Sequence, residues 1–250
     1  MIKLTPRLKM ISEEILKGET MADIGTDHGF LPIFLLQSKV CPFVVMTDIS
    51  YNSLKKAEDN CSEVLGEDEY PEEDGIKQPY LYDLRLGSGI EVIETKEVDA
   101  LVIAGMGGIL MTEILGKDKK KSKSFKKIVL QPRSQIGFLR HWLYNNGFSI
   151  EKEQLVAEGN NICEILTVVP KEKAITRGMD ENCVEYEFPH TLVDFKSDLT
   201  IRYLTEHLTK EKFILDRMRQ ANNRDSKKER HQEYRVEYIE YLIQKIVEKE

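Results

Sequence analysis

The chain has 250 residues, of which 41% are hydrophobic and 32% are charged, and its net charge is −7. The hydrophobic fraction is too high for a disordered chain, and the longest uncharged apolar run, from Ala100 to Met111, is too short to span a membrane. The negative balance argues against a protein that binds polyanions over its whole surface, although a local basic patch is compatible with it. The amino-terminal segment lacks the uninterrupted apolar core of a signal peptide.

The cysteines are scattered over the chain. Cys41, Cys61, Cys163 and Cys183 form no C-x-x-C pair, and no histidine lies at zinc-ligand spacing from them. Isolated thiols of this kind are typical of a reduced, cytoplasmic protein. We therefore expect a cytoplasmic location, no bound metal and no association with a membrane.

Up to about Pro170, short apolar runs alternate with helical patterns. An opening helix is predicted from Pro6 to Leu16, with Thr5 as its N-cap. The apolar runs predict strands over residues 20–25, 43–48, 78–83, 98–104 and 127–131, with helical stretches over 30–38, 50–64, 89–94, 108–115 and 135–145. This alternation predicts right-handed βαβ units in a Rossmann-like, doubly wound α/β sheet. Residues 147–157 and 161–169 lack an intervening helix and predict a closing antiparallel hairpin.

The sequence pattern changes after Pro170. Residues 171–193 are irregular and indicate a connector. Two helical patterns follow, joined by a turn at Asn222–Asn223, and they predict a coiled-coil hairpin. Their apolar positions are Ile201, Leu204, Leu208, Leu215 and Met218 in the first pattern, and Val236, Ile239, Ile243 and Ile246 in the second. The predicted domains are therefore residues 1–170 and 171–250. The apolar seams would serve an intramolecular hairpin or a dimer equally well, so the oligomeric state stays open.

Two segments are strongly charged. Residues 63–74 are acidic, and residues 117–127 carry seven lysines against one aspartate. Charge runs of this kind are usually solvated surface, and both segments have the character of insertions. The basic segment is also a candidate contact for phosphates.

The first predicted strand leads into Asp23-Ile24-Gly25-Thr26-Asp27-His28-Gly29, which is typical of the turn that holds a nucleotide-like cofactor. A dinucleotide fingerprint would need glycine at positions 25, 27 and 30, but Asp27 and Phe30 occupy two of them. A carboxylate in this turn would repel a pyrophosphate on the helix N-terminus, which disfavours a nicotinamide enzyme. The pattern instead favours a cofactor that lacks phosphates and carries positive charge, and S-adenosylmethionine fits.

Other predicted strand ends supply further candidates. Asp48 ends the second strand, where it can accept ribose hydroxyls, and Asp83 ends the third, where it can accept the adenine amino group. Each aspartate can instead be a helix cap or a turn residue. Gly105, in Ala104-Gly105-Met106-Gly107-Gly108, allows close approach to a ligand or a tight helix entry. At the end of the fifth strand, Gln131 and Arg133 are candidates to face a substrate.

Five segments together resemble a known family. They are ADIGTDHGFLP (22–32), TDIS (47–50), RLGSGI (85–90), IAGMGG (103–108) and LQPR (130–133). They are similar, in order, to the bacterial tRNA (adenine-N1)-methyltransferases that act at position 22 in the D-arm region, and the likeness runs from Thr5 to about Val169. The resemblance implies a class I methyltransferase dependent on S-adenosylmethionine, with a Rossmann-like domain and a carboxyl-terminal coiled coil. It also implies cofactor contacts at Asp23, Gly25, Asp27, His28, Asp48, Asp83 and Gly105.

The chemistry of adenine N1 suggests catalytic candidates. N1 already holds an in-plane lone pair, so alignment with the methyl group matters more than a base. We expect Asp27 to stabilise the charge that develops on the adenine and Phe30 to stack on the extruded base, with His28 beside them. Core packing is the competing explanation for Phe30, and backbone capping is the competing explanation for His28.

The predicted hairpin tip is basic. Residues 207–231 have a net charge of +4, and Arg224, Lys227 and Lys228 are candidate tRNA contacts. A solvated coiled-coil face explains these charges equally well. Two rival functions remain at this point: a methyltransferase of the same fold that acts on a small molecule or protein, and a non-catalytic protein whose coiled coil recruits a partner.

Overall fold

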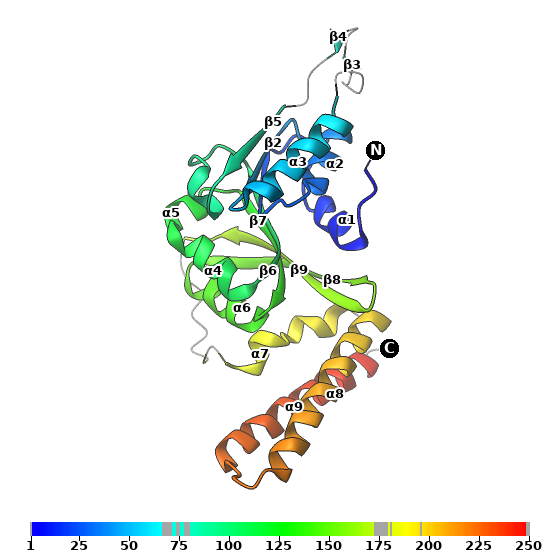
Figure 1. Cartoon of the computed structure of the whole chain (residues 1–250). Coiled ribbons are helices and arrows are strands. Elements are labelled where there is room, and N and C mark those ends of the chain that lie inside the picture. Colours follow the sequence, from blue (N-terminus) through cyan, green and yellow to red (C-terminus); the bar gives the residue numbers. More distant parts are fainter. Residues whose placement is uncertain are drawn as a thin grey trace. The chain divides into compact units, whose positions relative to one another are not determined.

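A computed structural model gives the fold (Figure 1) and describes residues 2–66, 72–73, 76–77, 81–172, 180, 182–195 and 197–248. Contacts divide the chain into two compact units, Met1–Gly178 and Met179–Glu250. Residues 78–80 of the third predicted strand, much of the acidic segment 63–74 and part of the connector 171–193 lie outside the described residues.

The first unit is built on a seven-stranded sheet with the order β5-β2-β1-β6-β7-β9-β8. Its strands are β1 (Met21–Ile24), β2 (Phe43–Asp48), β5 (Leu81–Leu86), β6 (Ala100–Gly107), β7 (Lys127–Ser134), β8 (Phe148–Glu158) and β9 (Asn161–Pro170). The first five pair in parallel, whereas β9 is antiparallel to both β7 and β8. The predicted doubly wound sheet and its closing hairpin are therefore confirmed. A separate two-stranded ladder joins β3 (Glu72–Glu73) to β4 (Ile76–Lys77).

Helices cover both faces of this sheet because its strands alternate between two apolar clusters. Ala22 and Ile24 of β1 belong to one cluster, whereas Met21 belongs to the other. The helices α1 (Pro6–Glu13), α2 (Phe30–Gln37) and α3 (Tyr51–Val64) contribute to the cluster that contains Met21. The opposite cluster includes side chains from the 3₁₀ helix η2 (Gly89–Val92), α4 (Gly108–Lys117) and α6 (Ile136–Asn145). The short helix α5 (Lys119–Ser122) lies within the basic segment.

The opening helix begins where the sequence predicts. The Thr5 hydroxyl caps it by accepting a hydrogen bond from the amide of Leu8, and Pro6 occupies the first turn. The helix ends at Glu13, earlier than predicted, and Glu14 caps it. The carboxylate of Glu14 accepts hydrogen bonds from Lys152 and Thr167, which fastens α1 to the β8–β9 hairpin.

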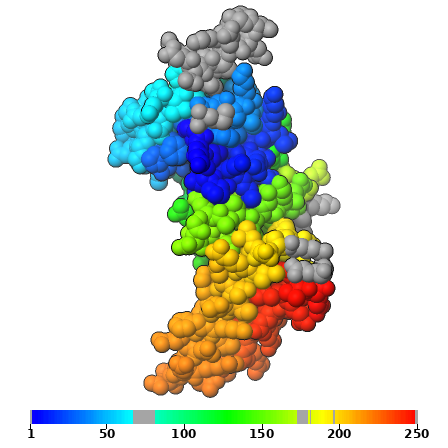
Figure 2. Space-filling model, turned by 90° about the vertical axis from the view of Figure 1, so that its right-hand side faces the viewer, coloured from blue at the N-terminus to red at the C-terminus, as the bar shows by residue number. Residues whose placement is uncertain are grey.

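The second unit contains α7 (Val184–Glu187), the 3₁₀ helix η3 (His190–Phe195), and the long helices α8 (Asp198–Gln220) and α9 (Ser226–Val247). The long helices run antiparallel along one another, as the predicted hairpin requires (Figure 2). Asn222 and Asn223 lie in the turn between them, and Asp225 caps α9. The buried apolar side chains of the pair are Tyr203, Leu204, Leu215, Val236, Ile239, Leu242 and Ile246. Leu242 is deeper than the predicted Ile243, which is only partly buried.

Polar contacts fix the register of the hairpin. The buried carboxylate of Glu211 on α8 accepts hydrogen bonds from Gln232 and Arg235 on α9. Arg235 also reaches Glu187 of α7 at 2.6 Å, which connects the short helix to the pair. No helix among the described residues is long and apolar enough to cross a membrane.

Candidate functional site

The carboxyl ends of the parallel strands meet at one edge of the sheet. In the registers of the ladders, Ile24 of β1 lies opposite Thr47 of β2 and Ile103 of β6, and Asp48 of β2 lies opposite Leu86 of β5. The turns that follow these residues are therefore neighbours. In doubly wound sheets this edge is where ligands bind.

The turn after β1 needs glycine for conformational and steric reasons. Gly25 has a φ of +73°, and a Cβ at this position would lie 2.3 Å from Cε of Met106. The amides of Gly25 and Thr26 both donate to the carbonyl oxygen of Thr47, which ties the turn to β2. A side chain at position 25 would therefore force both a strained backbone and a displaced methionine.

Asp23 is a buried carboxyl group inside this turn. Its side chain accepts a hydrogen bond of 2.8 Å from the Thr26 hydroxyl, and the residue is only 7% exposed. Burial raises the pKa of Asp23 from 3.8 to about 6; Asp48 reinforces the rise, and the Thr26 hydrogen bond and Arg7 oppose it. Because burial makes the ionised form of Asp23 unfavourable, this carboxylate is suited to bind a cationic or hydrogen-bond-donating ligand.

Asp48 ends β2, as the sequence predicts. One of its carboxylate oxygens accepts a hydrogen bond of 2.8 Å from the amide of Ser50, and the other accepts one of 3.3 Å from the amide of Asp27. The carboxylate therefore links the turn after β1 to the start of α3. Asp23 of β1 lies opposite Met46 of β2, so the two carboxyl groups belong to adjacent strands within two residues of the same level.

The prediction that Asp83 ends the third strand is wrong. β5 continues to Leu86, and Asp83 lies opposite Val45, three residues short of the level of Asp48. Since a strand rises about 3.3 Å per residue, Asp83 is displaced by roughly 10 Å from the strand end. Its carboxylate pairs instead with Arg85, whose guanidinium also binds Glu97.

The turn between β5 and η2 contains Ser88, which the sequence analysis does not single out. It is exposed, and its hydroxyl has no hydrogen-bond partner among the described residues. The amide of Gly87 donates to the carbonyl oxygen of Asp48, which holds this turn beside the β2 turn. The sequence signal for this longer strand is the alternation of apolar Leu84 and Leu86 with polar residues, which extends the strand up to the residue before Gly87.

Asp27, His28 and Phe30 gather at the mouth of the β1 turn. The carboxylate of Asp27 lies 3.5 Å from Nε2 of His28 and 3.4 Å from Nζ of Lys56 on α3. The rings of His28 and Phe30 stack with centroids 5.2 Å apart. Phe30 is 41% exposed, so core packing does not account for it.

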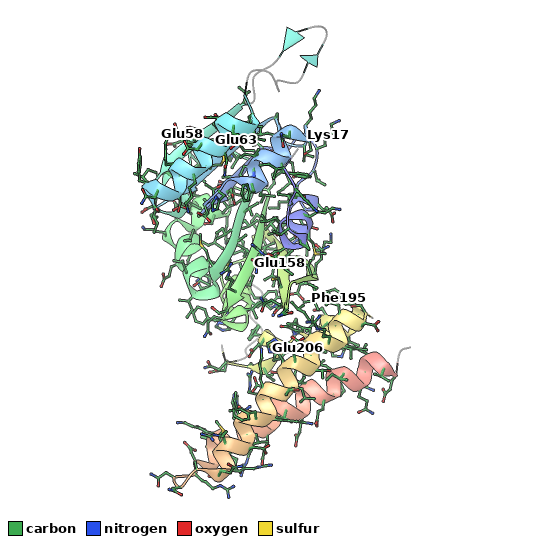
Figure 3. All side chains as sticks on the ribbon, turned by 45° about the vertical axis from the view of Figure 1, so that its right-hand side comes forward. Lys17, Glu58, Glu63, Glu158, Phe195 and Glu206 are labelled. Atoms are coloured by element: carbon green, nitrogen blue, oxygen red, sulfur yellow. The ribbon has the colours of Figure 1, made fainter. Side chains whose placement is uncertain are left out.

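Gln131 does not face a substrate, contrary to its prediction. Its side chain is buried, and its Oε1 accepts hydrogen bonds from the amide of Gly105 and from Nη1 of Arg7. Gln131 thus holds the irregularity between Ala104 and Met106 of β6, where Gly105 has a φ of +76°. Arg7 also pairs with Glu158 at 3.2 Å (Figure 3 labels Glu158 on the β8–β9 hairpin), so α1 contributes to the site. A single arginine on an amphipathic helix gives no sequence signal for this role.

Arg133 has the opposite character. It is exposed on β7, it has no acidic partner among the described residues, and its Nε lies 3.7 Å from where a Cβ on Gly105 would be. Within the described part of the chain, the guanidinium is therefore a free cation at the edge of the site. Exposed apolar side chains of Ile109 and Leu110 begin α4 on the neighbouring strand connection.

The predicted basic surfaces are partly neutralised. Arg224 forms a two-point ion pair with Glu229, and Nζ of Lys228 lies 3.8 Å from the carboxylate of Asp225. Lys227 is exposed and has no acidic partner in the described part of the chain. In the basic segment, Lys117, Lys126 and Lys127 pair with Glu91, Asp99 and Glu19, respectively. The described residues hold no cluster of three or more His, Cys, Asp or Glu side chains placed to bind a metal ion.

Five parallel strands, glycines near their carboxyl ends and the carboxylates of Asp23 and Asp48 are typical of a Rossmann-like enzyme that binds a nucleoside cofactor. Comparison with known proteins gives the family. A model described as "Methyltransferase domain" matches residues 4–166. The tRNA (adenine(22)-N(1))-methyltransferase of Bacillus subtilis is 27% identical over 97% of this chain and 98% of its own length.

Solved structures agree with this result. The B. subtilis tRNA methyltransferase TrmK has a TM-score of 0.81 at 25% identity, over 97% of this chain and all of that one. A Streptococcus pneumoniae protein in complex with S-adenosyl-L-methionine shares the fold, with a TM-score of 0.77 at 23% identity over 96% of this chain and all of that one. The chain belongs to the methyltransferase family, in the group of the tRNA (adenine(22)-N(1))-methyltransferases.

Proposed function

We propose that this protein transfers a methyl group from S-adenosylmethionine to N1 of the adenine at position 22 of tRNA. The observation that carries the proposal is the turn of residues 23–29, where a buried carboxylate, a required glycine and a second carboxylate from β2 meet. The full-length similarity to a B. subtilis enzyme of that specificity supports the substrate.

The residues of the turn fit this cofactor and not a dinucleotide. Asp23 and Asp48 face the same edge, and a pyrophosphate placed there would meet two negative charges. An ammonium group and ribose hydroxyls would instead be attracted, with Asp23 nearest the first and Asp48 accepting the second. Ser88, in the turn after β5, is the proposed hydrogen-bond partner of the adenine ring, because it is exposed beside the β2 turn.

Two glycines leave the backbone at the carboxyl edge of the sheet accessible to a ligand. Gly25 and Gly105 both have positive φ; Gly25 lies in the turn after β1, and Gly105 lies at the irregularity near the carboxyl end of β6. Without a Cβ, each position lets a ligand approach the backbone. Gln131 holds the β6 irregularity through the amide of Gly105.

S-adenosylmethionine supplies the methyl group, which passes to the N1 lone pair as the carbon–sulfur bond breaks and the sulfur keeps the electron pair. The protein's part is to align the adenine and to stabilise the positive charge that it gains. Asp27 is the proposed carboxylate for this charge, and its contacts with His28 and Lys56 hold it at the mouth of the turn. The exposed Phe30 ring, already stacked on His28, offers a surface for the extruded base.

Arg133 is the proposed contact for the tRNA backbone beside the target nucleotide. It is exposed, unpaired within the described residues and adjacent to Gly105. A guanidinium in this position can bind a phosphate through two parallel hydrogen bonds. Lys227 remains a proposed tRNA contact on the helical pair. Arg224 and Lys228 would have to break their ion pairs with Glu229 and Asp225, respectively, before they could bind tRNA.

The test is to incubate the protein with unmodified tRNA and S-adenosylmethionine, digest the tRNA and analyse its nucleosides by mass spectrometry. We expect 1-methyladenosine to appear. The Asp27→Asn variant should bind the cofactor but methylate at least tenfold more slowly, since it loses a charge that acts in the transition state. Glu58→Gln, which alters a carboxylate on the exposed side of α3, is the matched control. Absence of any methylated nucleoside, with cofactor binding intact, would refute the tRNA assignment.

A further inference from the structure

Helix α9 has an acidic flank that neutralises cations of α8 and of the turn between the two helices. Glu229 pairs with Arg224 of the turn at 2.5 Å. Glu233 and Glu240 pair with Arg219 and Lys212 of α8 at 2.7 and 2.6 Å, respectively. The core face of the helix packs on α8 through the apolar side chains named above. These two faces explain the pairing of the long helices. A third face of α9 borders α7 and η3, where the Tyr234 hydroxyl binds Glu185 and the Tyr241 ring lies 6.2 Å from the ring of His190, between centroids.

The third face carries only basic and aromatic side chains at helical spacing. Steps of three or four residues place them along one line, because 3.6 residues make a turn. We call this set the basic–aromatic stripe: Lys227, Arg230, His231, Tyr234, Tyr238, Tyr241 and Lys245.

The tyrosines of the stripe form a ladder. The ring centroids of Tyr234 and Tyr238 are 6.3 Å apart, and those of Tyr238 and Tyr241 are also 6.3 Å apart. Tyr234 and Tyr241 are 47% and 42% exposed, which is unusual for large aromatic side chains that serve only packing. The Tyr234 hydroxyl donates a hydrogen bond of 2.5 Å to Glu185 of α7, so this ring is held in place rather than free to rotate.

Cations accompany the rings at both ends. Lys227 and Arg230 are exposed and have no acidic partner among the residues that the structure describes. Nζ of Lys245 lies 5.8 Å from the Tyr241 ring centroid and 2.6 Å from the carboxylate of Glu248. The free positive charge is therefore concentrated near the start of α9, and the aromatic surface follows it along the helix.

We propose that the basic–aromatic stripe binds unpaired nucleotides of the tRNA, with bases stacked on Tyr234 and Tyr241 and phosphates bound by Lys227 and Arg230. Stacking on aromatic rings combined with cations along the strand is how proteins hold single-stranded nucleic acid. This inference rests on the proposed function and deepens it. It moves the expected RNA contact from Arg224 and Lys228, which are paired, to one face of α9.

The test measures binding of a fluorescent, unmodified tRNA transcript to the full chain by anisotropy, with S-adenosylhomocysteine present. Tyr234→Leu/Tyr241→Leu should weaken binding about tenfold or more, since each stacked base contributes measurably to affinity. Tyr234→Phe/Tyr241→Phe keeps the rings and should bind within about twofold of the parent. Phe213→Leu removes a ring that is 63% exposed on α8, off the stripe, and is the matched control.

The charges are tested through salt dependence. Lys227→Glu/Arg230→Glu should lower the slope of log affinity against log salt by about two, whereas Arg219→Gln, which removes a paired cation, should leave it unchanged. Unchanged affinity of the double leucine variant, or an equal loss with Phe213→Leu, would overturn the stripe while the parent still binds and methylates tRNA. Failure of the parent itself to bind or methylate tRNA would instead overturn the proposed function, and the stripe with it. Circular dichroism at 222 nm checks that each variant keeps its helices.

Discussion

Replacing Asp23 with asparagine should stabilise the fold and weaken cofactor binding. The carboxyl group is buried, and its pKa is raised from 3.8 to about 6, so its ionised form destabilises the folded state. At about 1.36 kcal/mol per pH unit, the rise corresponds to roughly 3 kcal/mol of stability that is lost once the group is ionised. Asparagine carries no charge, and its side-chain oxygen can still accept the hydrogen bond from Thr26.

The sign follows from proton binding. Between pH 3.8 and about 6 the folded state holds a proton that the unfolded state has released, so the stability of the parent falls as the pH rises, and the loss is complete above the folded pKa. The advantage of Asp23→Asn should therefore be about 1.5 kcal/mol at pH 5 and about 3 kcal/mol at pH 8. All other titrating groups are common to the two proteins and cancel in this difference.

The assay is urea unfolding of cofactor-free parent and variant at both pH values, with S-adenosylmethionine affinity measured by calorimetry at pH 8. We expect the stability gap to widen with pH and the affinity to fall at least tenfold, because the ligand loses a charged partner. A variant that is less stable than the parent at pH 8, or a gap that does not change with pH, would refute the reasoning.

Three further predictions follow from particular contacts. Gly25→Ala should reduce cofactor affinity at least tenfold, because its left-handed φ costs about 1–2 kcal/mol and the new Cβ would displace Met106; Gly116→Ala on α4 is the calorimetric control. Arg133→Ala should raise the KM for tRNA about tenfold with unchanged cofactor affinity, as steady-state kinetics at saturating cofactor would report. Arg140→Met should lower the free energy of unfolding by about 3–5 kcal/mol, since Glu153 and Glu164 lose their buried partner; a loss below 1 kcal/mol in urea unfolding would contradict this.

The sequence predicts most of the sheet because its buried strands are short, apolar and punctuated by glycine and aspartate. β2 runs from Phe43 to Asp48, as predicted, and the hairpin of β8 and β9 closes the sheet. The positions of Asp23, Gly25 and Asp48 at or next to the ends of β1 and β2 could be predicted because the sequence marks where these strands end.

The third strand shows where such reasoning fails. Asp83 is polar, and its position suggested a strand end. Its carboxylate instead forms an ion pair with the neighbouring Arg85, and the strand continues. Gln131 was misjudged for a related reason: a polar residue at a strand end can face inward when backbone and side-chain donors saturate it. Neither partner is close enough in sequence to signal the contact.

The tail illustrates a third limit. Net charge over residues 207–231 does not distinguish cations paired across the hairpin from free ones, because pairing depends on the register of two helices. The predicted tip residues Arg224 and Lys228 prove to have acidic neighbours, and the structure adds that the tyrosine rings of α9 lie next to one another.

The most direct test of the central claim is to locate the methylated nucleotide. The protein is incubated with S-adenosylmethionine and an unmodified tRNA that has adenine at position 22, and a matched transcript with guanine at that position is treated in parallel. Reverse transcription, which halts at 1-methyladenosine, then maps the product. The proposed activity predicts a halt at position 22 in the first transcript and none in the second. A halt at another position, or equal methylation of both transcripts, would contradict it.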